Sequence, residues 1–247
     1  MNKKVFVAGA TGAVGAVLVP LLVEAGYTVY GGTRRIDRAG ALEAKGAHPV
    51  VVDVFDAAAL DAALKRIAPW GVVHQLTDLP QNLDPKLMAE AVVRNARLRI
   101  EGTRNLVAAA QGAGAQRLVA QSIAWVYAPG AKPFTEDMPL DQDPESPRRI
   151  SADAVISLER SVLEAAGMAG TVLRYGQLYG PGTSSAEPRG GSPVHVEAAA
   201  WAAVLALRHA AAGIFNIAED NAEVSSEKAK RELEWNAAWR VPQGIVR

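Results

Sequence analysis

The chain of 247 residues contains no cysteine. It therefore has no disulfide framework, no thiolate metal site and no cysteine nucleophile. It also lacks an excess of charge of either sign, because 26 Lys and Arg residues balance 26 Asp and Glu residues. This balance gives no indication of a nucleic-acid partner or an acidic membrane surface as a partner.

The sequence also lacks an unbroken run of about 18 apolar residues, so we expect no transmembrane helix and no membrane partner. Lys3 and Lys4 precede an apolar run, as in a signal peptide, but three glycines interrupt the segment that would have to form its hydrophobic helix. His48, His195 and His209 show no metal-ligand spacing, so we predict no metal site. We expect a soluble cytoplasmic protein that acts on a small-molecule substrate, and a homodimer stays open.

Glycine, in contrast, is placed in a regular pattern near the start of the chain. Gly9, Gly12 and Gly15 follow the apolar run Val5–Ala8 and open an amphipathic segment. Such glycines allow a tight turn, the approach of a pyrophosphate to the backbone, and close packing of helix on strand. The start of the helix then offers free N–H groups to phosphate. The alternative is a glycine-rich turn that binds no nucleotide. The predicted dinucleotide contacts are Gly9, Ala10, Thr11, Gly12, Ala13, Val14 and Gly15.

Strand and helix patterns alternate along the rest of the chain. Strands are predicted near 5–8, 27–30, 50–52, 71–76, 117–121, 171–174 and 214–217. Helices are predicted from about 14, with a kink at Pro20, and near 56–68, 85–111, 152–166, 197–209 and 225–235. This alternation predicts an α/β fold of the Rossmann type, with a doubly wound parallel sheet. We expect a single domain over 1–247, with a dinucleotide-binding core at 1–174 and a smaller substrate-side region at 175–247.

Two segments break this rhythm. Residues 128–148 contain five prolines and no apolar periodicity, and residues 180–193 are rich in Gly, Pro and Ser. Long loops beyond the strand ends of such sheets commonly carry substrate contacts. We therefore expect both segments to lie near the substrate.

Taken together, these motifs resemble the extended short-chain dehydrogenase/reductase family, the NAD(P)-dependent sugar epimerases and dehydratases. The resemblance covers nearly the whole chain. Besides the glycines and Asp53, it rests on Glu101–Leu106, Ser122–Tyr127, Leu173–Gly182 and His195–Glu197. It implies NAD(P) as cofactor and an adenine contact for the acidic residue after the third strand. It does not define the substrate.

The chain departs from the family pattern at its catalytic positions. The family uses a Tyr-x-x-x-Lys pair, whereas Ser151 and Val155 stand at those two places. Arg99 replaces the usual asparagine before the Gly-Thr of the helix signature. Ile123 aligns with the usual serine or threonine, which leaves Ser122 one position early. The gap between residues 182 and 195 is also short for the family, so part of the usual substrate subdomain is expected to be missing.

Two arginines follow the second predicted strand, where an NAD-preferring site would carry an acidic residue. Arg34 and Arg35 suit the 2′-phosphate of NADP through charge-assisted hydrogen bonds. The alternative is a solvated basic loop. We therefore expect NADP, with NAD possible.

Other strand ends supply further candidates for the cofactor site. Asp53 and Val54 follow the third strand, where Asp53 would contact the adenine or cap the next turn. The end of the fourth strand offers Gln75, Leu76 and Thr77, as cofactor contacts or as ordinary turn residues. The preceding His74 is expected to be a hydrogen-bonded core histidine rather than a ligand.

The candidate catalytic residues are Tyr127 and Ser122, at the end of the fifth strand. Their hydroxyls could donate hydrogen bonds to a substrate carbonyl, or they could serve only in packing. Two functions stay open. The first is an NAD(P)-dependent oxidoreductase or epimerase-like enzyme on a small carbonyl or polar substrate. The second is a catalytically degenerate protein that binds NADP or senses nucleotide state. The missing Tyr-Lys pair favours the second function, whereas the retained serine, tyrosine and long loops favour the first.

Overall fold

The computed structural model describes residues 3–242, and its centre is a seven-stranded sheet in the order β3-β2-β1-β4-β5-β6-β9. Every neighbouring pair of strands is parallel. This arrangement confirms the doubly wound Rossmann-type fold. The strands are β1 (Lys4–Ala8), β2 (Thr28–Thr33), β3 (His48–Val51), β4 (Gly71–His74), β5 (Arg117–Ile123), β6 (Ala169–Tyr175) and β9 (Gly213–Ile217).

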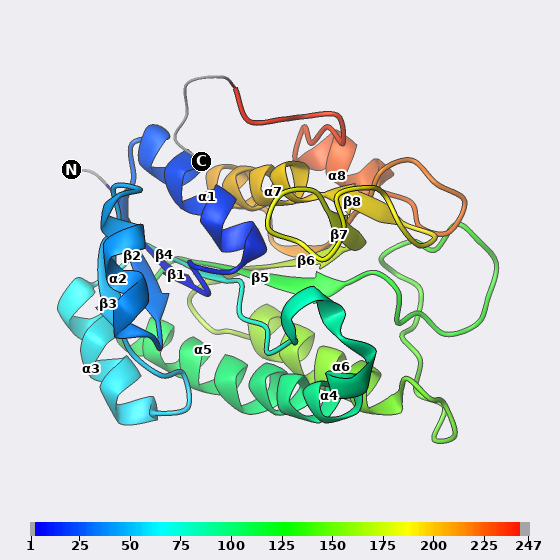
Figure 1. The fold of residues 1–247 in the computed structure, drawn as a ribbon, viewed down its shortest axis with the longest axis horizontal. Helices are drawn as coiled ribbons and strands as arrows, with labels where there is room; N and C mark the ends of the chain where they lie inside the picture. The colour runs from blue at the N-terminus through cyan, green and yellow to red at the C-terminus, as the bar shows by residue number, and fades with distance from the viewer. Residues whose placement is uncertain (1–2, 243–247) are drawn as a thin grey trace.

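Helices cover both faces of this sheet (Figure 1). One face carries α1 (Ala13–Glu24), α2 (Ala39–Glu43) and α7 (Val196–His209). The other carries α3 (Ala57–Ile67), α4 (Met88–Arg97), α5 (Thr103–Gly112) and α6 (Arg149–Leu163). Two separate apolar cores result, one on each side of the sheet. Because both faces are covered, strands such as β1 are continuous apolar runs rather than alternating ones.

Pro20 lies inside α1, as predicted, and α1 continues through it as one helix. The helices differ from the predicted ones in two places. The predicted helix at 85–111 is divided into a 3₁₀ turn (Pro85–Leu87), α4, a π-helical turn (Leu98–Gly102) and α5. The short helix α2 was not predicted. A Cβ on Gly102 would lie 3.0 Å from the Leu98 side chain, so a residue without a side chain suits this irregular turn.

The segment after β6 contributes to the main sheet as well as to the region beyond it. Its strand β9 forms one edge of the seven-stranded sheet, and α7 packs against α1. A small parallel pair, β7 (Gln177–Tyr179) and β8 (Pro193–His195), lies outside the main sheet. The chain then forms α8 (Glu227–Glu232). Within residues 3–242 no helix is long and apolar enough to cross a membrane.

Candidate active site

The glycine-rich turn between β1 and α1 is shaped by packing at two of its three glycines. Gly9 has φ +83°, and a Cβ there would lie 2.5 Å from the carbonyl oxygen of Gln75. A Cβ on Gly15 would lie 2.2 Å from the carbonyl oxygen of Gly9. A Cβ on Gly12 would come near only the Gly9 carbonyl oxygen, at 3.4 Å. Gly12 is therefore free of internal packing and leaves open space in front of the helix.

The first turn of α1 offers unused N–H groups to that space. Gly12 is the N-cap residue, no side chain caps the helix, and the first turn contains no acidic residue. The positive end of the helix dipole is thus available to an anion. Gly182 (φ +76°), from the loop at 180–193, lies close by, because a Cβ there would sit 3.8 Å from Cα of Ala13. These features fit a dinucleotide pyrophosphate.

A pocket opens beside the turn, at the carboxyl ends of β1, β2 and β4. Its walls include five of the predicted residues, namely Gly9, Arg34, Val54, Leu76 and Thr77. It also includes residues that the sequence reasoning did not single out: Phe6, Ala8, Gly32, Thr33, Val52, Leu60, Asp78, Leu98 and Leu106. Most of these are apolar, and an apolar slot of this kind suits a flat heterocycle such as adenine. In the sequence these residues are recognisable only as parts of predicted strands and helices. That pattern does not show that they line one pocket.

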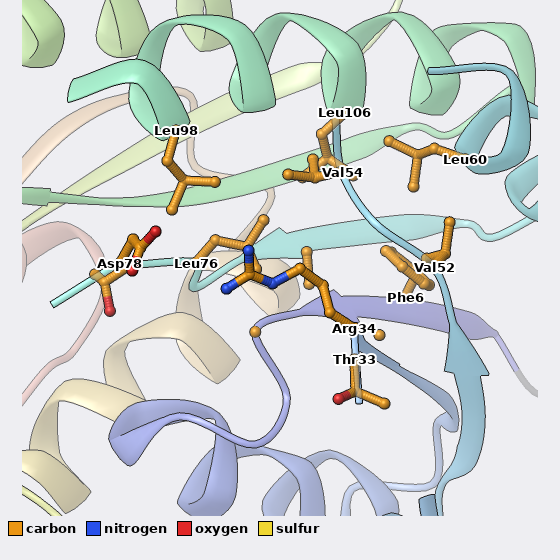
Figure 2. A pocket seen from close by; sticks show the side chains of 14 residues that line it. Phe6, Thr33, Arg34, Val52, Val54, Leu60, Leu76, Asp78, Leu98 and Leu106 are labelled. Carbon is orange, nitrogen blue, oxygen red and sulfur yellow. The ribbon is translucent and has the colours of Figure 1, made fainter. Parts of the chain in front are cut away.

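The two arginines after β2 have different surroundings. Arg34 lines the pocket, and Figure 2 shows its side chain extending toward Leu76. Within the described part of the chain Arg34 forms no ion pair. Arg35 instead donates from Nε to Oδ1 of Asp37 at 3.0 Å on the exposed surface. The structure thus brings Arg34 to the pocket and leaves Arg35 outside it.

Two other candidates are held by local contacts. Asp53 accepts a hydrogen bond from the backbone N–H of Phe55 at 2.9 Å and is not part of the pocket wall. The side chain of Gln75 is buried and donates to the hydroxyl of Tyr175 at 3.3 Å. Gln75 thus meets the glycine turn through its backbone rather than its side chain. Contacts of Asp53 and Gln75 with a nucleotide stay predictions.

His74 lies at the end of β4 and is buried. Its Nδ1 accepts a hydrogen bond from the backbone N–H of Leu76 at 3.2 Å, and its Nε2 lies 2.9 Å from the hydroxyl of Thr103. Burial, together with the nearby positive charge of Arg99, lowers the pKa of His74 to about 4. His74 is therefore a neutral, hydrogen-bonded core residue, as expected. Within residues 3–242, no group of three His, Asp or Glu side chains is arranged to hold a metal ion.

Both candidate catalytic hydroxyls lie inside the protein. Ser122 is 2% exposed and donates to Oε1 of Glu159 at 2.7 Å. Tyr127 is also 2% exposed and donates to Oδ1 of Asn216 at 2.7 Å. Arg174 connects the two, because it donates to the Tyr127 hydroxyl at 2.8 Å and to both oxygens of Glu159 at 2.7 and 2.9 Å.

This buried network affects the acidity of its members. Burial raises the pKa of Tyr127, although the charge of Arg174 and its hydrogen bond oppose the change. The Tyr127 hydroxyl therefore stays protonated at neutral pH and is not available to accept a proton. The structure joins Tyr127 and Ser122 through Arg174 and Glu159 but places neither at an open surface. A catalytic role for these two residues stays a prediction.

The outward side of the same segment is apolar. Trp125 is 40% exposed, whereas Ala124 and Val126 on either side of it are buried. In the middle of α6, Val155 is completely buried. The positions where the resemblance implies an acid and its lysine therefore hold Ser151 and an enclosed valine.

Arg99 is a further cation near this edge. It lies in the π-helical turn and is only 8% exposed. Burial lowers the pKa of its guanidinium to about 10, and the charge of Glu159 partly opposes this change. Arg99 stays positively charged at neutral pH.

Comparison with known proteins places these features in a family. The model of the NAD dependent epimerase/dehydratase family matches residues 5–206. A 3-diazoavenalumate denitrifying reductase from Streptomyces sp. is 41% identical over 238 residues, which cover 88% of this chain and 76% of that protein.

Solved structures share the fold. The UDP-glucose-4-epimerase from Stenotrophomonas maltophila, with bound NAD and formylated UDP-arabinopyranose, has a TM-score of 0.78 at 18% identity, covering 97% of this chain and 94% of that one. The UDP-glucose 4-epimerase of Thermus thermophilus, in complex with NAD, has a TM-score of 0.71 at 23% identity, covering 91% and 80%.

The family match spans most of the chain. This chain belongs to the NAD dependent epimerase/dehydratase family.

Proposed function

We propose that this protein is an NADPH-dependent reductase whose substrate accepts hydride without needing a proton from the protein. The pyrophosphate would bind over residues 10–14, against the start of α1. Adenine would enter the pocket between Leu76 and Val54, and Arg34 would bind the 2′-phosphate. When bound, the reduced nicotinamide supplies the hydride.

The observation that supports this proposal is the lack of a proton donor where the family carries one. Ser151 and Val155 replace the Tyr-Lys pair, and Ile123 replaces the serine or threonine. The hydroxyls of Ser122 and Tyr127 are already committed to Glu159 and Asn216. Reduction of a carbonyl produces an alkoxide that must be protonated, and an assisted proton transfer is worth about 10²–10⁴-fold in rate.

A diazonium group is a hydride acceptor that avoids this requirement. A C–H bond forms from the hydride, the C–N bond breaks, and its electron pair leaves with N₂. The cationic substrate and the hydride together give neutral products, so the overall change consumes no proton. The denitrifying reductase at 41% identity is named for a diazo substrate. A neutral diazo compound becomes a diazonium cation when it takes up a proton from water, so this name favours the diazonium class for the present chain.

In this scheme the side chains of the site position and enclose the substrate rather than exchange protons with it. Tyr127 and Ser122 would act through the network that they form with Arg174 and Glu159, by fixing the backbone that follows β5. Their hydroxyls would then matter more for the stability of the fold than for the chemical step.

The test is a turnover assay with NADPH carrying deuterium at the transferred position. The panel contains a stable arenediazonium salt, a set of aldehydes and ketones, and UDP-glucose, each with an enzyme-free control. We expect enzyme-dependent NADPH consumption only with the diazonium salt, and deuterium on the carbon that lost nitrogen. The rate should change little with pH between about 6 and 9, because no protein acid titrates in the step.

Two outcomes would overturn the proposal. Turnover of carbonyl compounds that Tyr127→Phe abolishes would show that Tyr127 is the missing acid. Tight NADPH binding without turnover of any compound would identify a nucleotide-binding protein that has lost catalysis.

A further inference from the structure

The segment after β5 holds Trp125 in a fixed position at the carboxyl edge of the sheet. The backbone N–H of Ala124 donates to the carbonyl of Tyr175 at 2.9 Å, and the carbonyl of Val126 accepts from Asp141 at 2.8 Å. The carbonyl of Trp125 itself accepts from Nη1 of Arg148 at 3.0 Å. With its backbone held from several sides, the segment directs its indole outward while both neighbours are buried.

Trp125 differs from the other four tryptophans, each of which has a partner within the protein. Trp70 donates a hydrogen bond from Nε1 to a glutamine side chain at 3.0 Å, and Trp235 donates to a backbone carbonyl at 2.9 Å. Trp201 and Trp239 stack on each other with ring centroids 4.6 Å apart. Among the side chains that the structure describes, the indole of Trp125 has no stacking partner, cation–π contact or hydrogen bond.

Other exposed apolar side chains belong to the segments that border this edge. Leu79, Leu83 and Leu87 follow β4, which is the neighbour of β5 in the sheet. Ile150 lies in the first turn of α6, two residues after the arginine that binds the Trp125 carbonyl. Ligands of doubly wound sheets bind beyond the carboxyl ends of the strands. Exposed apolar side chains thus occur on two of the segments that border the carboxyl end of β5.

We propose that Trp125 is the stacking platform for a planar aromatic ring of the substrate. An indole face attracts an aromatic ring in offset-stacked geometry, and its attraction exceeds that of an aliphatic side chain of equal area. The leucines and Ile150 would exclude water around the ring. This inference deepens the proposed reductase function, since it assigns an aromatic electrophile as the substrate class, but ring binding itself requires no turnover.

The test measures binding of unreactive probes to the protein saturated with NADP⁺. The probes are 3-phenylpropanoate and 3-cyclohexylpropanoate, which share a carboxylate and chain length and differ in the ring. We expect the phenyl probe to bind more tightly and to quench tryptophan fluorescence. Trp125→Ala should weaken binding of the phenyl probe by about tenfold and remove the quenching, whereas Trp125→Phe should retain most of the affinity.

Matched variants separate this effect from general damage. Leu163→Ala removes another exposed apolar side chain from α6, and Trp201→Phe removes a different indole, so both should bind the phenyl probe as the wild type does. Cofactor affinity should be unchanged in Trp125→Ala. Equal binding of both probes, or phenyl binding that survives Trp125→Ala in a folded protein, would overturn the inference. Either result would leave the reductase proposal standing, and phenyl binding without diazonium turnover would refute the reductase proposal alone.

Discussion

At the scale of single residues, we expect the choice between NADPH and NADH to depend on Arg34. Its side chain lines the pocket beside the glycine turn, whereas Arg35 is paired with Asp37 outside it. We expect Arg34→Ala to weaken NADPH binding about ten- to a hundredfold, the loss of a charge-assisted contact of about 1.5–3 kcal/mol, with little effect on NADH. Calorimetric titration with both cofactors measures this, and Arg35→Ala is the matched control. An equal loss of both cofactors would show that Arg34 does not bind the 2′-phosphate.

A second residue links stability to pH. The folded pKa of His74 is about 4, against a reference value of 6.5, so the unfolded chain binds the proton more readily. The contribution of neutral His74 to the free energy of unfolding is complete above about pH 6.5. It decreases as the pH falls toward 4, by about 3 kcal/mol in all. In urea unfolding, the free energy of unfolding of His74→Gln should therefore decrease less between these pH values than that of the wild type.

At the scale of elements, we expect substitutions at different glycines of the turn from β1 to α1 to affect either cofactor binding or thermal stability. Gly12 is open to solvent at φ −77°, so Gly12→Val is expected to fold with nearly unchanged thermal stability. Its side chain would occupy the space of the pyrophosphate, so cofactor binding should be lost. Gly15→Ala would place a Cβ 2.2 Å from the Gly9 carbonyl oxygen, so it should lower the melting temperature strongly. Calorimetry and NADPH titration of both variants measure this, and a Gly12→Val protein that binds normally would contradict it.

At the scale of the whole molecule, the buried pair of Glu159 and Arg174 joins α6 to β6, with Ser122 and Asn216 extending the network to β5 and β9. Removing one partner leaves a buried charge uncompensated, so Glu159→Ala should destabilise the fold by about 3–5 kcal/mol.

Denaturant unfolding of Glu159→Ala measures this loss. The control is Asp153→Ala, which breaks an exposed pair with Arg149 and should cost less than about 1 kcal/mol. The double variant Glu159→Leu with Arg174→Met should recover much of the stability, because it removes both charges. A single variant as stable as the wild type would show that the pair contributes little to holding these elements together.

The sequence by itself determined the order of strands and helices, the glycine turn and the family. These features depend on short-range rules, namely the period of apolar residues and the sterics of glycine, which act within a few residues of the chain. The irregular turn at 98–102 and helix α2 escaped prediction because packing against other elements, such as Val54 on Gly102, decides such details.

Only the tertiary structure decided which candidate side chains face the site. Ser122 and Tyr127 read from the sequence as hydroxyls at a strand end, but partners 37 and 89 residues away direct them inward. In the same way, Asp37 binds Arg35, whereas Arg34 lines the pocket. The loop at 180–193 approaches the first turn of α1. The direction of a side chain beyond the end of a strand is set by long-range hydrogen bonds and burial, which the spacing of residues along a chain does not contain.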